Sequence, residues 1–264
     1  MSGLELYHWE PNGCWLKPLV LLHEKAVAFE SRYVDVLSFE AHRAGFMPGS
    51  RETQLNQEGE GPILVHEGRQ ITESFFMLEY LEDAFPARPL RPAGALGHAR
   101  ILAWARFINE VLMPAANTLG CHQYLVPLLQ SRNTTSPEQT LESIPMKLLQ
   151  DGWRLALTGG YGPELLAESH RKVKLAVQRI EDSLARSPWL VADSYSLADI
   201  DAFSICNALP KLTPEIVGPT ATPRLLEWLE RIRARPAVRA ALSSSRTGRP
   251  EEAFVPGPEH SRWG

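Results

Sequence analysis

The pattern of apolar residues changes near residue 86, and this change limits the folds that the chain can adopt. Before it, short alternating segments are interleaved with helical ones; after it, no segment is typical of a strand. Residues 86–92 contain three prolines, and proline disfavours helix in the residue before it. We therefore predict a mixed α/β unit at 1–86, a linker at 87–93 and an all-helical unit at 94–245.

The first unit is predicted to run strand, helix, strand, hairpin, helix. Alternating polarity marks the strands and spacing of three or four marks the helices. Ser74 precedes the last of these helices and is its predicted N-cap. This βαβ-ββα order is thioredoxin-like, but the CxxC motif is lacking. The ranges are a strand at 4–9, a helix at 14–29, a strand at 33–36, a hairpin at 62–72 and a helix at 75–85.

The second unit is predicted to contain only helices, followed by a loose C-terminal segment. Ser196 and Asp199 have the spacing of a capping box, with Tyr195 as a hydrophobic staple, so we assign them to folding rather than to chemistry. From residue 246 to 264 the chain is rich in glycine, proline and charge, which predicts a loose tail. The predicted helices are near 94–130, 137–158, 163–186, 197–208 and 222–242.

Composition excludes several classes of function. The chain has 44% hydrophobic residues, 22% charged residues and a net charge of -4. A nucleic-acid partner is not expected, because no basic face is clustered in the sequence. Three cysteines without a CxxC motif favour a reducing compartment. We see no signal peptide or membrane span and expect a cytoplasmic protein. The histidines lack metal-ligand spacing, so no metal is expected.

Three short segments are candidates for binding or chemistry, and each also has a purely structural interpretation. Pro62 follows glycines at a strand start, where it is a simple strand initiator or an edge that pairs with an extended peptide, with a possible cis bond. Glu73 and Ser74 precede a helix, where they cap it or receive a ligand carboxylate and ammonium. Cys14 stands where strand turns to helix, as a small buried residue or a reactive thiol.

Taken together, these features resemble the cytosolic glutathione S-transferases, over about residues 4–245. The supporting features are the βαβ start, the Gly61-Pro62 step, Glu73-Ser74 and the 196–200 segment. Within that family, the chain looks most like the bacterial β-etherases that cleave aryl ethers of lignin dimers. The segments similar to those enzymes are 16–19, 71–74, 79–86 and 195–200.

The resemblance implies roles for particular residues. The Gly61 backbone should pair with the cysteinyl part of glutathione beside a cis Pro62. Glu73 and Ser74 should hold the γ-glutamyl end, and the turn at Asn12, Gly13 and Cys14 should lie near the thiol. The helical unit should form the acceptor pocket, and family members usually form dimers. The pocket candidates are Trp9, Trp15, Phe107, Asn109, Met113, His122, Tyr124, Trp153 and Tyr161, of which Tyr124 follows a predicted helix break at 120–122.

The chain departs from the β-etherases at the thiol turn. They carry an Asn-Ser pair where Cys14-Trp15 stands here, so the serine that would hydrogen-bond the thiolate is missing. Cys14 matches the cysteine of the Cys-type transferases, and Asn12 is another possible donor. The loop at 43–57 is longer than in the family, and Asn56-Gln57 replaces the usual Asn-Pro.

Three functions follow as alternatives. An etherase would use glutathione thiolate to displace a phenolate from the carbon alpha to a ketone, forming a thioether. A Cys14-dependent thiol transferase or glutathione lyase would form a mixed disulfide with glutathione. A catalytically weak chain would serve in a homo- or heterodimer. Glutathione and an aromatic ether are the expected ligands.

Overall fold

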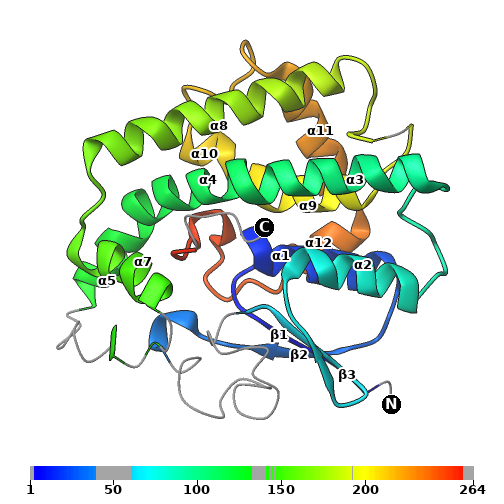
Figure 1. The fold of residues 1–264 in the computed structure, drawn as a ribbon, viewed down its shortest axis with the longest axis horizontal. Coiled ribbons are helices and arrows are strands. Elements are labelled where there is room, and N and C mark those ends of the chain that lie inside the picture. The colour runs from blue at the N-terminus through cyan, green and yellow to red at the C-terminus, as the bar shows by residue number, and fades with distance from the viewer. Residues whose placement is uncertain are drawn as a thin grey trace.

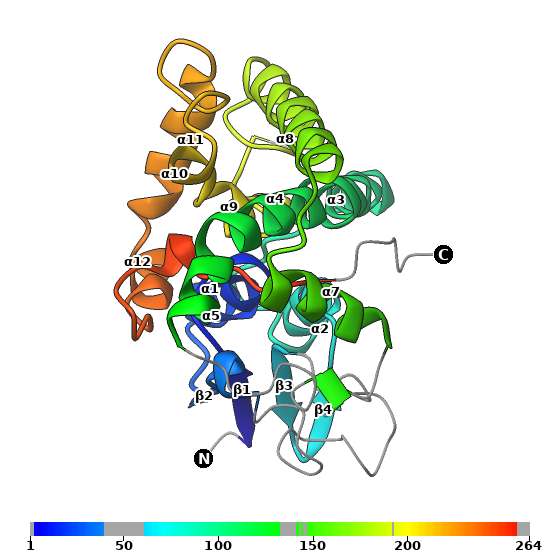
Figure 2. The same cartoon turned by 90° about the vertical axis from the view of Figure 1, so that its left-hand side faces the viewer.

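A computed structural model describes residues 3–39, 61–132, 141–142, 144, 147–191 and 193–257. In this part of the chain, one small sheet lies at one end of the molecule and helices make up the rest (Figure 1). Helices α1 and α2 lie between the sheet and the longer helices (Figure 2). The predicted loop at 43–57, including Asn56-Gln57, lies outside the described residues.

The sheet has four strands in the order β2-β1-β3-β4. β1 is parallel to β2 and antiparallel to β3, so that Leu6 lies opposite Ser31 and Leu64. Every second residue of β1 is buried, as its alternating sequence predicts. The strand bounds are β1 Leu4–His8, β2 Glu30–Tyr33, β3 Ile63–His66 and β4 Arg69–Ile71.

The prediction of a strand at 33–36 is wrong, because β2 lies earlier in the chain. Val36–Ser38 forms the short 3-10 turn η2 instead. The Asp35 carboxylate accepts a hydrogen bond from the backbone N–H of Leu37 at 3.0 Å. This local bond competes with pairing to a neighbouring strand and ends the extended segment.

The first helix is shorter than predicted, and the second has a different cap. The 3-10 turn η1, Gly13–Trp15, leads into α1, Leu16–Glu24. Ala26 then adopts a left-handed φ of 54°, which ends the helical run. The predicted N-cap at Ser74 is wrong: Glu73 is the N-cap, and α2, Ser74–Ala84, begins at the serine.

The helical part follows a segment without helix or strand at residues 85–94. Helix α8 crosses the top of the molecule above α3 and α4 (Figure 1). The bounds are α3 Ala95–Phe107, η4 Ile108–Leu112, α4 Met113–Gly120, η5 Cys121–Leu125, α5 Val126–Ser131, α7 Lys147–Thr158, α8 Pro163–Leu184, α9 Leu197–Cys206, α10 Leu209–Leu212, α11 Pro223–Arg233, α12 Pro236–Leu242 and η6 Pro250–Glu252.

The predicted helix break at 120–122 is wrong, because η5 continues the helix as a π turn. The other π turn, η4, likewise stands just before a proline, Pro114, and η5 stands before Pro127. Proline lacks the N–H of a regular helix and clashes with the preceding turn, and a π turn accommodates it without ending the helix. The predicted helix at 222–242 is divided into α11 and α12 at Pro236 for the same steric reason.

Helix α9 is buried along its whole length and begins at the predicted capping box, which is confirmed. The backbone N–H and the hydroxyl of Ser196 donate to Asp199 Oδ2 at 3.0 and 2.9 Å. Asp199 also accepts from Trp228 Nε1 and from the backbone N–H of Leu190. One carboxylate therefore links the helix start to two neighbouring segments.

The C-terminal segment is packed as far as the structure describes it, so the prediction of a loose tail is wrong for residues 246–257. Within this segment, the carbonyl oxygen of Ala253 accepts a hydrogen bond from Asn12 Nδ2 just before η1. Phe254 is only 2% exposed, and burying such a side chain stabilises the folded state by about 2 kcal/mol. Residues 258–264 lie outside the described part.

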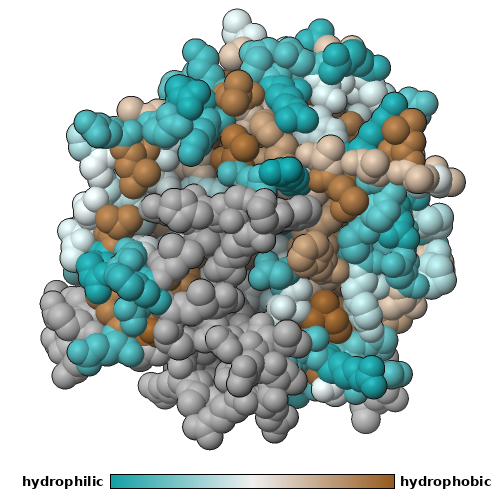
Figure 3. Space-filling view, viewed as in Figure 1, coloured by the Kyte–Doolittle hydropathy of each residue, from teal (hydrophilic) through white to brown (hydrophobic). Residues whose placement is uncertain are grey.

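Within the described residues, no helix is long and apolar enough to cross a membrane. On the face shown in Figure 3, apolar residues form separate groups among hydrophilic ones. The exposed large apolar side chains are Phe76, Leu96, Leu102, Leu128 and Leu175.

Candidate functional site

The turn between β1 and α1 holds the two residues predicted to be catalytic. Cys14 is half-buried, and its Sγ lies 3.8 Å from the carbonyl oxygen of Gly61. The thiol turn and the Gly61-Pro62 step therefore lie next to each other in the fold. Asn12 is 2% exposed, and its Nδ2 donates to the carbonyl of Ala253 at 3.0 Å. The sequence did not predict this partner, because 241 residues separate the two groups.

Two buried polar atoms at this turn have no hydrogen-bond partner among the described residues. They are Asn12 Oδ1 and Trp15 Nε1. An unpaired buried polar group is costly, so such atoms mark places that merit a functional explanation. The contact with Ala253 assigns the Asn12 amide, because a carbonyl oxygen only accepts and the atom that faces it is therefore the Nδ2 donor.

Gly61 and Pro62 are joined by a cis peptide bond, as the resemblance implies. A Cβ at Gly61 would lie 2.2 Å from Cζ3 and 2.4 Å from Cη2 of Trp15. Real Cβ atoms do not approach other heavy atoms so closely, so only glycine fits against the indole ring. Trp15 is 5% exposed and meets Trp9 edge-on at 6.5 Å. Trp15 therefore packs against Gly61 and Trp9 packs against Trp15; both tryptophans were predicted as pocket residues.

Glu73 and Ser74 stand at the N-terminus of α2. Glu73 is exposed and has φ 63°, a left-handed conformation that is unusual for a residue other than glycine, asparagine or aspartate. Backbone strain of this kind is found preferentially at functional positions. Ser74, in the first turn, lies beside backbone N–H groups that favour an anion.

The predicted acceptor residue Asn109 makes hydrogen bonds within the protein. Its Oδ1 accepts from Lys17 Nζ at 2.6 Å, and its Nδ2 donates to Asp201. Lys17 and Asp201 form an ion pair at 2.7 Å, and both side chains are fully buried. Asn109 therefore joins the Lys17–Asp201 ion pair to the helix that precedes η4 and α4.

The other pocket candidates lie in different surroundings. Met113 is 8% exposed and belongs to the core, and Trp153 meets Phe39 edge-on at 4.7 Å. Tyr124 is half-buried and stacks on Phe254, with ring centroids 6.1 Å apart. His122 and Tyr161 meet edge-on at 6.0 Å, while Phe107 lies under the Arg179 guanidinium at 4.0 Å.

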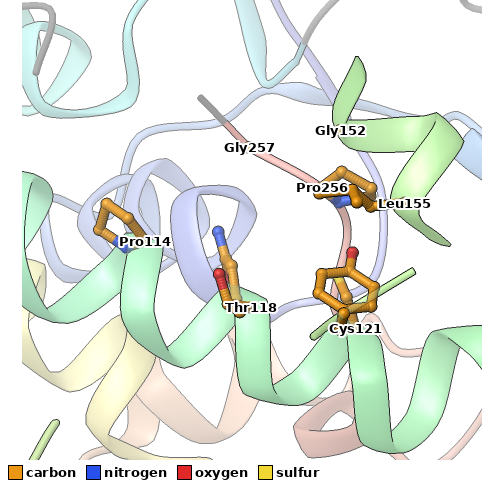
Figure 4. Close-up of a pocket in the computed structure, with 9 residues that line it drawn as sticks. Pro114, Thr118, Cys121, Gly152, Leu155, Pro256 and Gly257 are labelled. Carbon is orange, nitrogen blue, oxygen red and sulfur yellow. The ribbon is translucent and has the colours of Figure 1, made fainter. Parts of the chain in front are cut away.

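A small pocket lies between α4, α7 and the C-terminal segment (Figure 4). Pro114 and Thr118 of α4 and Cys121 at the start of η5 line one side, and Pro256 and Gly257 face them from the C-terminal segment (Figure 4). Of the predicted residues, only Tyr161 lines it. The spacing of Pro114, Thr118 and Cys121, four and three residues apart, places them on one helix face and was a usable signal. The remaining lining residues are Asn117, Gly152 and Leu155.

The Cys121 thiol is not suited to act as a nucleophile. Burial raises its pKa to about 12, although a hydrogen bond with Tyr161 lowers it. A thiol with such a pKa holds its proton at neutral pH. Within the described residues, no group of three or more His, Cys, Asp or Glu side chains is arranged to hold a metal ion.

Comparisons with known proteins identify the family. The sequence family "Glutathione S-transferase, C-terminal domain" matches residues 144–236. Protein LigF of Sphingobium sp. (strain NBRC 103272 / SYK-6) is 35% identical over 249 residues, which cover 92% of this chain and 94% of LigF. The chain belongs to the glutathione S-transferase family. Glutathione is accordingly its cosubstrate.

Solved structures agree with this membership. The crystal structure of beta-etherase LigF from Sphingobium sp. strain SYK-6 matches with a TM-score of 0.83, covering 92% of this chain and all of that one. Glutathione transferase F7 from Populus trichocarpa, 22% identical, matches with a TM-score of 0.68 over 91% of this chain and 98% of that one, and it supports the fold alone. The thioredoxin-like part followed by a helical part is the fold of this transferase family.

Proposed function

We propose that this glutathione S-transferase is a β-etherase, which cleaves the β-aryl ether bond of lignin-derived aromatic dimers. The similarity to LigF along nearly the whole of both chains carries the proposal. In this proposal, residues 1–86 bind glutathione, residues 87–93 link the two domains, and residues 94–245 supply the acceptor pocket and the dimer surface.

The residues at the thiol turn fit the cysteinyl part of glutathione. Gly61 and Pro62 lie just before β3, where the backbone of an extended peptide can add to a strand end. Glu73 offers a carboxylate to the γ-glutamyl ammonium, and Ser74 with the α2 N-terminus receives its carboxylate. The Cys14 turn faces Gly61, so a thiol bound there would lie near the start of α1.

The proposed reaction displaces a phenolate from a carbon that stands alpha to a ketone. Glutathione thiolate attacks this carbon, a C–S bond forms, and the C–O bond to the aryl group breaks. The thiol proton goes to solvent and the phenolate takes up a proton on release, so the reaction is redox-neutral. Backbone N–H groups at the start of α1 favour the thiolate, because hydrogen bonds and a helix N-terminus stabilise the charged form.

The test is glutathione-dependent phenol release from an α-aryloxy ketone by the purified chain. The proposal expects phenol and a glutathione thioether in equal amounts. Release of neither product, under conditions in which glutathione binds, would remove the etherase assignment.

A second candidate is a Cys14-dependent thiol transferase or lyase. The half-buried Cys14 Sγ beside Gly61 favours it, because a mixed disulfide with glutathione would place both sulfur atoms at this turn. A Cys14–glutathione disulfide, detected by mass spectrometry as an intermediate of turnover, would support this candidate.

We also propose that the chain works as a dimer, as members of this family commonly do. A monomer in analytical ultracentrifugation that retains full activity would contradict this. A monomer that gains activity only on mixing with a related chain would indicate a heterodimer.

A further inference from the structure

A second cavity, open to solvent, lies where α9, α11 and α12 end and where η6 begins. Figure 2 shows α10, α11 and α12 on one side of the molecule. The cavity has a volume of about 360 Å³, which falls within the range of small-molecule sites. The described residues that line it include none from the thiol turn or the Gly61-Pro62 step. It is therefore a site separate from the one proposed for glutathione.

Two polar side chains of this cavity, Asn207 and Arg233, hold each other in place. Arg233 Nε donates to Asn207 Oδ1 at 2.8 Å, and Arg233 Nη2 donates to the Asn207 carbonyl at 3.1 Å. Arg233 Nη1 donates to Glu230 Oε1 at 2.6 Å. A guanidinium has five N–H donors, so two remain, and the asparagine amide keeps the two N–H groups of Nδ2. This part of the cavity is a fixed group of hydrogen-bond donors.

Apolar side chains supply another part of the cavity. They are Pro210 in α10, Leu242 at the end of α12 and Pro250 in η6. Leu242 packs against the hydrophobic core, and proline side chains lose almost no rotamer entropy when a ligand covers them. Apolar walls with a few fixed polar groups are the usual composition of a small-molecule site.

The charge of the surrounding chain favours an anion. Residues 231–250 contain six arginines and no aspartate or glutamate, although the whole chain has a net charge of -4. Arg235 pairs with Glu24 and Arg249 pairs with Glu252, so this run is not a continuous basic face for a nucleic acid. Residues 207–252, which include every lining residue, contain eight Lys or Arg and five Glu, a balance of +3. A positive balance raises the local concentration of anions.

The rim of the cavity carries one ion-pair cluster. Lys211 pairs with Glu251 at 3.2 Å and with Glu252 at 2.6 Å. Lys211 and Glu251 both line the cavity, so a ligand meets one charge of each sign there. Exposed pairs of this kind contribute little and exchange partners readily. The fixed donors of Arg233 and Asn207 therefore decide the sign of the ligand.

We infer that this cavity binds a small organic anion in which a carboxylate is attached to an apolar body. Arg233 and Asn207 hold the carboxylate, because their planar N–H groups match its two oxygens. Pro210, Leu242 and Pro250 pack against the apolar body. The inference adds a binding site that does not depend on the proposed etherase reaction.

The first experiment locates the probe by NMR. The full chain, with its thiol side filled by S-hexylglutathione, is titrated with benzoate while the methyl resonances of Leu242 are followed. Leu175, exposed on α8, is the control. We expect shifts at Leu242 alone, with Kd on the order of 1 mM. Benzamide, which lacks the charge, and acetate, which lacks the ring, should each bind at least about tenfold more weakly.

The second experiment changes the charges of the site. Arg233→Gln should weaken benzoate binding at least about tenfold, whereas Glu251→Gln should strengthen it about threefold by removing a like charge. Arg171→Gln is the matched control, since Arg171 pairs with Glu168 three residues away on α8, as Arg233 pairs with Glu230. This control should leave Kd unchanged.

Asn207→Asp replaces Arg233→Gln if the latter does not fold. It keeps the Oδ1 acceptor for Arg233 and exchanges the Nδ2 donors for a negative oxygen, so it should abolish benzoate binding.

The contrary results are equally specific. No shift at Leu242, or equal binding of benzamide, would overturn the anion site, and equal binding of acetate would overturn the role of the apolar walls. Benzoate binding that S-hexylglutathione abolishes would place the probe at the thiol side and overturn the inference as well. A chain that binds benzoate at Leu242 but releases no phenol from an α-aryloxy ketone would remove the proposed function alone.

Discussion

At the scale of single residues, the thiol turn separates the two candidate chemistries. If glutathione thiolate is the nucleophile, Cys14→Ser should keep most of the etherase activity, since the Sγ contact with Gly61 at 3.8 Å is weak. Loss of a covalent nucleophile costs at least about 10⁴-fold in kcat. Steady-state rates of Cys14→Ser therefore decide between the two, and a loss of that size would assign the chemistry to Cys14.

Gly61 offers a second test at this scale. Gly61→Ala would place a methyl group inside the contact radius of the Trp15 ring, and overpacking of this kind costs about 1–3 kcal/mol. We expect a lower free energy of unfolding by denaturant and weaker glutathione binding. Gly162→Ala, which enters open space, is the control. Adding Trp15→Leu should recover part of the loss; no recovery would mean that the ring is not the cause.

The sequence predicted local features at this scale and missed distant partners. Gly61, Pro62, Glu73 and Ser74 were recognisable because their signals lie within a few neighbouring residues. The contact of Asn12 with Ala253 depends on two segments meeting in the folded chain, and no local pattern encodes it. The partners of Asn109 were not predictable for the same reason, since they lie on α1 and α9.

At the scale of elements, the capping box of α9 controls stability. Asp199→Ala would leave the donors on Ser196, Leu190 and Trp228 without their acceptor. We expect a loss of about 3 kcal/mol or more in the free energy of unfolding. Ser196→Ala, which keeps the carboxylate, should cost about 1 kcal/mol. Equal losses in chemical denaturation of the two variants would contradict this account.

Asp199 also gives a pH dependence. Burial raises its pKa to about 6, although hydrogen bonds from Trp228, Leu190 and Ser196 lower it. An unfolded chain releases this proton near pH 4, so between about pH 4 and 6 the folded state binds more protons and ionisation lowers stability as the pH rises. Asp199→Asn should remove this part of the pH dependence; an unchanged slope in that window would place the titration elsewhere.

The hydrogen bonds that attach residues 245–247 to Glu10 should strengthen as the pH rises, opposite to the trend at Asp199. Burial raises the pKa of Glu10. Hydrogen bonds from Ser245, Tyr33, Arg246 and Thr247 lower the pKa by more than burial raises it, so the net pKa lies below the usual value. Its contribution is therefore complete above the usual glutamate pKa and is lost as the pH falls through the depressed one. We expect Glu10→Gln to raise hydrogen exchange of 245–257 at neutral pH, whereas the wild type should show this rise only in acid.

Element boundaries show where sequence reasoning stops. The hairpin and α8 lie close to their predicted positions because their periodicity is strong. β2 was placed too late because its residues are mostly exposed and carry no apolar alternation. We predicted a loose tail from its glycine and proline content. In the structure, the Phe254 ring packs against Gly120, and the Glu10 carboxylate accepts a hydrogen bond from the backbone N–H of Arg246.

At the scale of the whole molecule, buried charges join the sheet part to the helical part. Lys17 and Asp201 are both fully buried, so removing one partner leaves an uncompensated charge and costs about 3–5 kcal/mol. We expect losses of that size for Lys17→Met and for Asp201→Leu alone, with recovery in the double variant. The exposed pair Arg106–Glu110 is the control and should contribute at most about 1 kcal/mol. Additive losses in the double variant would show that the pair is not coupled.

The central claim is that this transferase joins glutathione to an aromatic ether carbon and releases a phenol. The most direct measurement incubates the purified chain with glutathione and an α-aryloxy ketone and quantifies phenol and thioether by mass spectrometry. The account predicts equal amounts of both products, dependent on glutathione and retained in Cys14→Ser. Glutathione binding without release of either product, in the chain alone and in its dimer, would contradict it.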